Sequence, residues 1–321
     1  MDATTVAAAA LASVVVTGVV AALLPRLGVV DVPNHRSSHA RPVPRGGGIG
    51  VVAGLLTGLL VSAPDQQLAI GLAAAVALAV LGFVDDVRSL PALLRLVAQV
   101  VVAALAAAVL VRALDMDLAV GITVTAAATL WLTGYVNVFN FMDGSNGLAG
   151  LSALIAGATF AWVGWAESEP TLLVGGSVLL GAAAGFLPWN FPVARIFLGD
   201  VGSYSTGFLV AWLGLVGVLT TDRYAWCLAP TVLVLLDTSL TLVRRARRGE
   251  SLMEAHREHV YQRLTTVPGS PLPAIVTALF GAAFVASAAL PPIALAVTWM
   301  ILGGAYVAMP HLVGRTSSVN A

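Results

Sequence analysis

Residues 5–24 read TVAAAALASVVVTGVVAALL, an uninterrupted apolar run without a charged side chain. About 20 apolar residues in a helix cross the hydrocarbon core of a bilayer. No basic segment precedes this run and no small-residue cleavage site follows it, so we expect a retained transmembrane helix and not a signal peptide. Because comparable runs recur along the chain, this stretch sets the fold class.

Composition agrees with that fold class. The chain is 59% hydrophobic and 10% charged, whereas about a quarter of the residues of a soluble domain are charged. We therefore predict an all-α polytopic membrane protein with a single domain over residues 1–321. Its one cysteine, Cys227, excludes an intrachain disulfide and a cysteine-based metal site.

Apolar windows separated by polar breaks predict eleven transmembrane helices. The last two windows are split only by Pro291 and Pro292 and also fit one re-entrant pair, so the expected bundle has 10–11 spans. The predicted helices lie at residues 5–25, 48–64, 66–83, 91–111, 118–137, 148–165, 170–188, 203–220, 224–243, 271–290 and 292–310.

The arginines divide unevenly between the two sides when the loops alternate from the first helix. All 16 basic residues are arginine, and one side receives only Arg112 and Arg223. The other side receives Arg26, Arg36, Arg41, Arg45, Arg88, Arg95, Arg195, Arg244, Arg245, Arg247, Arg248, Arg257, Arg263 and Arg315. By the positive-inside rule, the arginine-rich side is predicted to be cytoplasmic.

The unusual polar clusters all fall on that same side. They are residues 31–47, Asp85-Asp86, Asn137–Gly147, Asn190–Ser203 and His256–Arg263. A secondary transporter would place its polar residues near the bilayer midplane, where Asp237 is the one good candidate. The pattern therefore favours an active site in cytoplasmic loops over passage across the bilayer.

Two of these clusters contain oxygen-bearing side chains next to glycines. Residues 137–147 read NVFNFMDGSNG, and residues 199–203 read GDVGS at a predicted helix start. Side-chain oxygens suit a hard cation, and free backbone N–H groups suit the phosphate that such a cation carries. For Asp200, a simple N-cap is the alternative, although it leaves the spacing of Gly199 and Gly202 unexplained.

The other charged clusters point to phosphate chemistry. Adjacent carboxylates at Asp85 and Asp86 repel each other, which indicates a cation, a proton or a base role, with two solvated residues as the alternative. Arg95 could hold a phosphate or extend to lipid headgroups. His256 and His259 have a spacing compatible with zinc, but no third ligand follows in a zinc pattern. We therefore favour phosphate or nucleotide contact there.

Taken together, these motifs resemble the polyprenyl-phosphate N-acetylhexosamine-1-phosphate transferases, integral membrane enzymes that start bacterial glycan assembly. The matching segments are DVPNHRSSHARPVPRGG at 31–47, the pair Asp85-Asp86, NxxNxxDG from Asn137, GDxGS from Gly199, and the histidine loop after Leu236-Asp237-Thr238. Five motifs in the same order make the resemblance specific over most of the chain.

The resemblance implies transfer of a sugar-1-phosphate from a UDP-N-acetylhexosamine to polyprenyl phosphate, with UMP released. It implies Mg²⁺, with Mn²⁺ as a substitute, held by Asn140 and Asp200. It further implies that Asp85 and Asp86 are catalytic residues, with Asp85 orienting or deprotonating the lipid phosphate. The implied substrate-binding residues are Arg95, Asn137, Asp143, His256, Arg257 and His259. Relatives are often dimers, which allows a homodimer; a nucleic-acid partner is not implied.

The chain also departs from many relatives. Asn146 replaces a common aspartate, and the histidine loop lacks the His-x-His-His pattern. The loop is closer to the branch that primes surface polysaccharides than to the branch that uses UDP-N-acetylmuramoyl-pentapeptide. A phospho-N-acetylmuramoyl-pentapeptide transferase and a membrane transporter remain as alternatives. The expected location is the plasma (inner) membrane, spanned several times.

Overall fold

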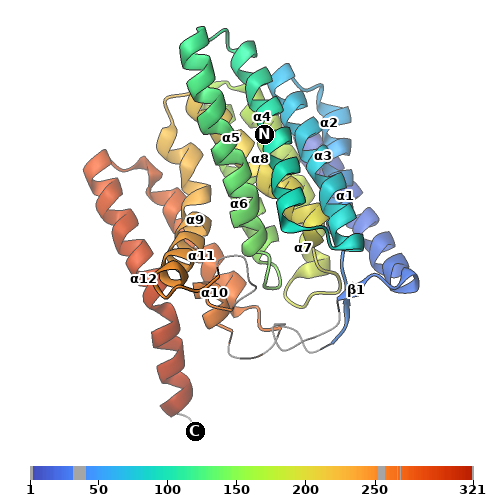
Figure 1. The fold of residues 1–321 in the computed structure, drawn as a ribbon, viewed down its shortest axis with the longest axis vertical. Helices are drawn as coiled ribbons and strands as arrows, with labels where there is room; N and C mark the ends of the chain where they lie inside the picture. Colours follow the sequence, from blue (N-terminus) through green and yellow to red (C-terminus); the bar gives the residue numbers. More distant parts are fainter. Residues whose placement is uncertain (1–2, 32–40, 252–256, 266, 268, 320–321) are drawn as a thin grey trace.

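The computed structural model describes residues 3–31, 41–251, 257–265, 267 and 269–319, and its helices form one bundle with the connections at its two ends (Figure 1). Ten helices in this described part are long and apolar enough to cross a membrane, and the shorter apolar helix α2 (Gly48–Ser62) joins them. The last two predicted spans are separate helices, α11 and α12. The prediction of an all-α polytopic membrane protein is confirmed.

The long helices alternate in direction, and most are joined by short connections; longer segments follow α1 and α9 (Figure 1). In chain order the remaining elements are α1 (Ala3–Leu23), η1 (Leu24–Leu27), β1 (Val30–Asp31), β2 (Val43–Pro44), α3 (Gln66–Arg88), α4 (Ala92–Ala113), α5 (Leu118–Phe141), α6 (Leu148–Glu167), α7 (Pro170–Asn190), α8 (Gly199–Thr220), α9 (Tyr224–Arg247), α10 (Val260–Arg263), α11 (Leu272–Ala286), η2 (Ser287–Ala289) and α12 (Pro292–Val319). Strands β1 and β2 pair antiparallel and are too short to have been predicted from a residue pattern.

Helices α3, α5, α8 and α9 extend beyond their predicted ends at the same end of the bundle. Helix α3 continues from residue 83 to Arg88, α5 from 137 to Phe141, and α9 from 243 to Arg247. Helix α8 begins four residues earlier than predicted, at Gly199. The predictions were wrong here because each ended a helix at its first polar residue. In the structure Asp85 contacts Tyr204 of α8, and Asn140 contacts Asp200, from within helical turns.

Glycines let the helix backbones approach closely. A Cβ atom at Gly157 of α6 would lie 2.5 Å from the backbone nitrogen of Leu180 in α7, and one at Gly176 would lie 2.2 Å from the nitrogen of Ala161. Small residues at such crossings are how membrane helices gain packing contacts without a hydrophobic driving force. Helix α8 packs against α2, α3, α5, α6, α7 and α9, so it forms the centre of the bundle.

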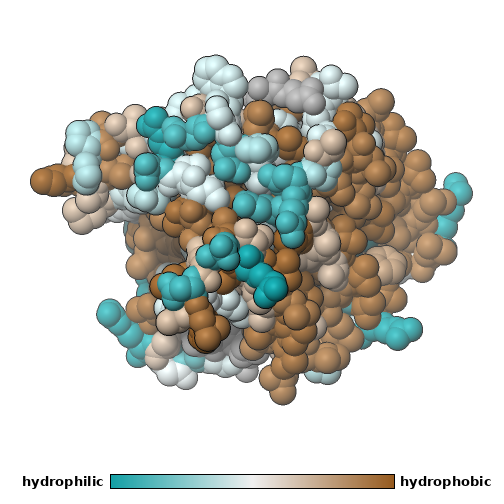
Figure 2. Space-filling view, turned by 90° about the horizontal axis from the view of Figure 1, so that it is seen from above, coloured by the Kyte–Doolittle hydropathy of each residue, from teal (hydrophilic) through white to brown (hydrophobic). Residues whose placement is uncertain are grey.

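Hydrophobic side chains cover the flank of the bundle, and polar side chains gather in patches on the end face (Figure 2). Leu105, Leu130 and Met300 are 64%, 77% and 69% exposed on these flanks. Large apolar side chains exposed in such number mark a surface that faces lipid rather than water.

The polar clusters predicted from sequence meet at one end of the bundle, the end at which α12 finishes (Figure 1). The backbone nitrogen of Gly46 donates to the oxygen of Phe197 over 3.1 Å. The hydroxyl of Tyr261 donates to the oxygen of Phe141 over 2.9 Å. These contacts join segments far apart in sequence, and we call this end of the bundle the site end.

Candidate active site

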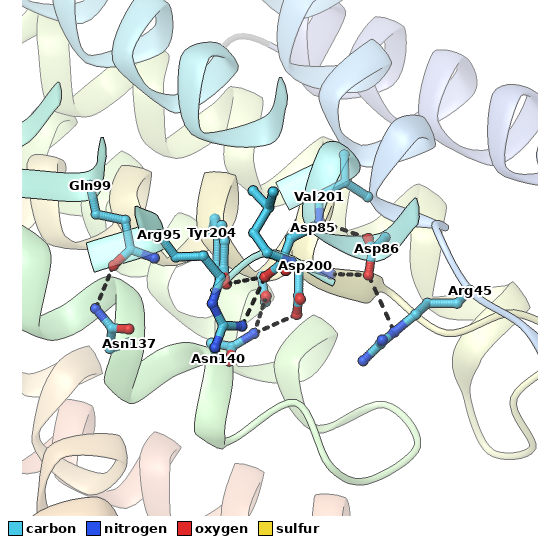
Figure 3. Close-up of polar contacts among 12 residues, drawn as sticks. Arg45, Asp85, Asp86, Arg95, Gln99, Asn137, Asn140, Asp200, Val201 and Tyr204 are labelled. Carbon is cyan, nitrogen blue, oxygen red and sulfur yellow. Dashed lines mark hydrogen bonds and ion pairs between the residues drawn. The ribbon is translucent and has the colours of Figure 1, made fainter. Parts of the chain in front are cut away.

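The carboxylate of Asp85 lies in the last turn of α3 and accepts three hydrogen bonds (Figure 3). Its donors are the Arg95 guanidinium at 2.8 Å, the Leu90 backbone nitrogen at 2.8 Å and the Tyr204 hydroxyl at 3.0 Å. The Asp85 side chain is 3% exposed, whereas the Arg95 side chain is 34% exposed. The ion pair therefore anchors Arg95 and leaves part of its guanidinium accessible to an anion.

The neighbouring carboxylate, Asp86, turns instead to the start of α8. It accepts the backbone N–H groups of Asp200 and Val201, both at 3.1 Å, and lies 3.3 Å from Nε of Arg45 (Figure 3). A carboxylate at a helix N-terminus satisfies free donors and stabilises the helix dipole. Asp86 therefore fixes the position of Asp200, and the two adjacent aspartates have different partners.

Glycines explain why α8 can begin so close to α3. Gly199 has a φ of +74°, and a Cβ atom there would lie 2.7 Å from a carboxylate oxygen of Asp86. A Cβ atom at Gly82 would lie 2.2 Å from the backbone oxygen of Asp200. The N-cap alternative for Asp200 is wrong, because the cap residue is Leu198 and Asp200 lies in the first turn.

Asn140 and Asp200 lie side by side, as their proposed common role requires. The Asn140 amide donates to Asp200 over 2.9 Å and to the Ser203 hydroxyl over 2.8 Å (Figure 3). Within the described residues, no group of three or more His, Cys, Asp or Glu side chains is arranged to hold a metal ion. One carboxylate and one amide nevertheless fit Mg²⁺, which commonly takes only one or two carboxylates and completes its shell with phosphates and water.

Arg45 is a cation of this site that was not predicted from the sequence as a site residue. Burial lowers the pKa of its guanidinium, but the negative charges of Asp200, Asp86, Asp31 and Asp143 outweigh burial and raise it. Its position after Pro44 in the motif at 31–47 was visible in the sequence, but nothing there indicated which carboxylates it would meet. The guanidinium therefore balances a strongly negative site.

Asp143 follows the end of α5 and belongs electrostatically to the same group. Burial raises the pKa of its carboxyl well above the usual range, Arg45 lowers it, and the charges of Asp200 and Asp86 raise it further. A cation bound nearby would favour the ionised form of this carboxyl. The role predicted for Asp143 at the nucleotide sugar stays a prediction.

An apolar cavity of about 610 Å³ opens beside this group, between α4, α5 and the end of α9. Arg95, Asn137, Asn140 and Tyr204 line the part near the site end. The rest of the lining lies deeper along α4 and α5 and is mainly apolar, with Leu96, Val100, Ala126, Thr129, Leu130 and Gly134 among its residues. The cavity is therefore polar near the site end and mainly apolar along α4 and α5.

Asn137 is placed in this cavity by a second polar residue that was missed. Its amide donates to the side-chain oxygen of Gln99 over 2.7 Å and to the backbone oxygen of Thr133 over 2.9 Å (Figure 3). Gln99 is 1% exposed and is an isolated polar residue in an apolar span. The isolation of Gln99 was the signal that could have identified it. Tyr204 was also missed, although it directly follows the GDxGS motif.

His259 of the histidine loop is buried against Asp237. His259 is 2% exposed, and its ring contacts Asp237 at 3.1 Å rather than an open surface. Arg257 is exposed, and His256 lies outside the described residues. Substrate binding by these three residues stays a prediction.

Two asparagines near the site satisfy backbone groups. Asn190 accepts from the Gly147 nitrogen at 2.6 Å and donates to the Ile196 oxygen at 2.9 Å. Asn146 donates to the backbone oxygens of Pro192 and Gly269 at 3.5 and 3.4 Å. Asn146 therefore connects the central turn to the segment after the histidine loop and is suited to that neutral role.

This chain is similar in sequence to known transferases. The family model described as glycosyl transferase family 4 matches residues 68–218, which include the acidic pair, the central turn and the start of α8. Decaprenyl-phosphate N-acetylglucosaminephosphotransferase of Mycobacterium tuberculosis is 30% identical over 302 residues, covering 81% of this chain and 74% of the relative.

Two further relatives carry corresponding names. The probable undecaprenyl-phosphate N-acetylglucosaminyl 1-phosphate transferase of Bacillus subtilis is 26% identical, covering 78% of this chain and 73% of the relative. Undecaprenyl-phosphate alpha-N-acetylglucosaminyl 1-phosphate transferase of Escherichia coli is 25% identical, covering 82% and 76%. With its membrane bundle and its matching motifs, this chain belongs to glycosyl transferase family 4.

Proposed function

We propose that this protein transfers N-acetylglucosamine-1-phosphate from UDP-N-acetylglucosamine to a polyprenyl phosphate. The supporting observation is that Arg95 and Asn140 both line the apolar cavity while each is held by a carboxylate, Asp85 or Asp200. An apolar channel that ends at a guanidinium suits a long hydrocarbon chain with a terminal phosphate. All three relatives described above are named as transferases that act on such lipid phosphates.

In the proposed reaction, an oxygen of the lipid phosphate attacks the β-phosphorus of the nucleotide sugar. The bond between that phosphorus and the oxygen bridging to the α-phosphorus breaks, and UMP leaves. A phosphate monoester is largely dianionic near neutrality, with a second pKa of about 6, so it needs little help from a base. Asp85 therefore acts mainly by orienting Arg95, which holds the attacking phosphate.

Asn140 and Asp200 are the residues that would hold Mg²⁺ or, as a substitute, Mn²⁺. A bound magnesium ion supplies positive charge against the charge that develops on the transferred phosphoryl group. Asp86 keeps Asp200 in place through the backbone of α8. Arg45 adds a fixed positive charge beside Asp86 and Asp200, and Asp143, which acts on the same guanidinium, would contact the donor.

We also propose that the site end faces the cytoplasm. Fourteen of the 16 arginines belong to this side by the alternation of the spans. The alternative of a transporter loses its main support, because Asp237, its mid-span candidate, accepts hydrogen bonds from His259, Val260 and Tyr306 inside the bundle. The N-acetylmuramoyl-pentapeptide alternative is not favoured by the names of the relatives.

The proposal is tested by incubating the purified protein with Mg²⁺, polyprenyl phosphate and a panel of UDP-sugars. We expect UMP release with UDP-N-acetylglucosamine that requires both the lipid and the metal. UDP-N-acetylgalactosamine and UDP-N-acetylmuramoyl-pentapeptide complete the panel and separate the branches of the family. If no UDP-N-acetylhexosamine yields UMP, the proposed function is wrong.

The role of the cavity leads to a separate prediction for Gly134→Phe. A Cβ atom at Gly134 has no neighbour within 4 Å, so the phenyl ring can extend into the cavity without disturbing the fold. We expect the KM for polyprenyl phosphate to rise about tenfold, equivalent to about 1.4 kcal/mol of lost apolar contact. The KM for the UDP-sugar should not change.

The matched control is Gly304→Phe in α12, where a Cβ atom also has no neighbour within 4 Å. This variant adds the same ring to a helix that does not line the cavity. Equal kinetic effects in the two variants would show that the cavity does not hold the acceptor.

A further inference from the structure

Asp237 is a fully buried carboxylate that the proposed chemistry does not use. It lies inside α9 with 0% exposure and accepts hydrogen bonds on both oxygens. Its donors are the His259 ring at 3.1 Å, the Val260 nitrogen at 2.9 Å, the Tyr261 nitrogen at 3.2 Å, the Tyr306 hydroxyl at 2.9 Å and the Thr241 hydroxyl at 3.4 Å.

This arrangement attaches the short helix α10 to the membrane bundle. The carboxylate binds the backbone N–H groups of Val260 and Tyr261 at the start of α10, and Tyr306 connects the same carboxylate to α12. A carboxylate inside a membrane protein is costly unless its hydrogen bonds are complete. Because one turn of helix is unstable alone, α10 depends on this external cap.

Helix α10 in turn contacts the segment that follows α5. The Tyr261 hydroxyl donates to the backbone oxygen of Phe141 over 2.9 Å. A Cβ atom at Gly144 would lie 2.2 Å from that hydroxyl, so the ring lies directly against the turn. Phe141 is adjacent to Asn140, and Gly144 is adjacent to Asp143. Tyr261 therefore contacts a neighbour of Asn140, which is expected to face the metal, and a neighbour of Asp143, which is expected to face the donor.

A second set of contacts joins the end of α9 to residues that precede α10. Arg245 pairs with Glu250 and Glu258, both at 2.9 Å, and Arg248 pairs with Glu250 at 2.8 Å and also with Glu258. Arg245 is 6% exposed and additionally donates to the backbone oxygen of Ser251 over 2.7 Å. The end of α9 is therefore joined to Glu250 and Ser251 and also to Glu258.

From these contacts we propose that Asp237 is a positioning residue for the nucleotide-sugar side of the site. It holds α10 so that Tyr261 fixes the turn at 141–144, and with it the side chains of Asn140 and Asp143. His259 belongs to the same unit, because its buried ring is held by Asp237 and packs on Tyr261 with ring centroids 5.5 Å apart. This inference rests on the proposed function for the identity of the donor.

The lipid side of the site has separate supports. Arg95 is held by Asp85, and the cavity is formed mainly by α4 and α5. Loss of the Asp237 contacts should therefore lower kcat/KM for the donor and leave the KM for polyprenyl phosphate unaltered. A general loss of stability would affect both substrates.

The test compares Asp237→Asn and Tyr261→Phe with the wild-type protein. In Asp237→Asn an amide N–H₂ replaces one accepting oxygen and opposes donors that the carboxylate satisfied. We expect kcat/KM for UDP-N-acetylglucosamine to fall by about 10–100-fold, the range seen when an orienting partner is removed. The KM for polyprenyl phosphate should not change.

A second readout does not depend on activity. Trypsin cleavage after Arg263, the last residue of α10, reports whether this helix stays attached. We expect faster cleavage in Asp237→Asn and wild-type cleavage in Tyr261→Phe, which keeps the cap and loses only the bond to Phe141. Tyr261→Phe should nevertheless lower kcat/KM for the donor, by a smaller factor than Asp237→Asn.

Asp65→Asn is the matched control, since Asp65 also caps a helix and accepts from Leu68 at 2.8 Å, but at the opposite end of the bundle. Equal effects of Asp65→Asn and Asp237→Asn on the donor, unchanged cleavage in Asp237→Asn, or unchanged donor kinetics in Tyr261→Phe would each overturn the inference. A wild-type protein without UMP release would instead overturn the proposed function, and the cleavage test of Asp237 would still stand.

Discussion

Asp200→Asn is expected to lower turnover by about 10²–10³-fold, the loss typical when one electrostatic contact to a transition state is removed. The substitution removes a negative charge and hardly changes shape. The new side chain retains an oxygen that can accept the hydrogen bond of Asn140, and the backbone bond from residue 200 to Asp86 is unaffected. The variant should therefore fold while losing the charge that would hold the metal.

The measurement is UMP release at saturating substrates over a range of Mg²⁺ concentrations, together with thermal stability in detergent. Asp115→Asn makes the same chemical change at an exposed position at the opposite end of the bundle and serves as the control. Near-normal activity in Asp200→Asn would remove Asp200 from the metal site. A large fall in stability would assign it a structural role instead.

Arg95→Gln is the second change for which we expect a large effect. It removes the cation that contacts the Asp85 carboxylate at 2.8 Å and that also lines the cavity. Asp85 keeps its bonds from Leu90 and Tyr204 but loses its counter-ion. We expect kcat/KM for polyprenyl phosphate to fall about 100-fold, because the lost contact is made to a charged group in a water-poor site.

Two comparisons make this result specific. Arg95→Lys keeps the charge but not the planar fork of donors, so we expect a loss of about tenfold at most. Arg88→Gln removes an exposed arginine from the end of α3, where lipid headgroups are the expected contact. If Arg95→Gln behaves like Arg88→Gln, Arg95 contacts headgroups and does not hold the acceptor.

Much of the fold could be predicted because a bilayer restricts the chain so strongly. Uncharged runs such as residues 5–24 have to form helices, since lipid offers no partner for an unpaired backbone group. The convergence of the polar clusters followed from alternation of the spans alone. The exact helix ends did not follow, because the helical state of Asp85, Asn140 and Asp200 depends on partners from other helices.

The site was predictable in its motifs but not in its internal contacts. Asn140 and Asp200 were paired correctly in space, and their hydrogen bond is direct. Arg45 was counted only for the orientation of the bundle, and Asp237 was considered only as a transporter residue. Their partners lie on other helices, and no residue spacing in the sequence indicates such contacts. Gln99 was missed for the same reason.

The glycine contacts at the start of α8 have a consequence for how this protein can diverge. A Cβ atom at Gly48 would lie 2.2 Å from Gly202, and the contact of Gly82 with Asp200 is equally close. Both are contacts with backbone, so side-chain replacement cannot relieve a substitution there. The segment after α9, in contrast, is attached through side chains such as Asp237 and Arg245. Substitutions can therefore accumulate in that segment more readily than at the start of α8.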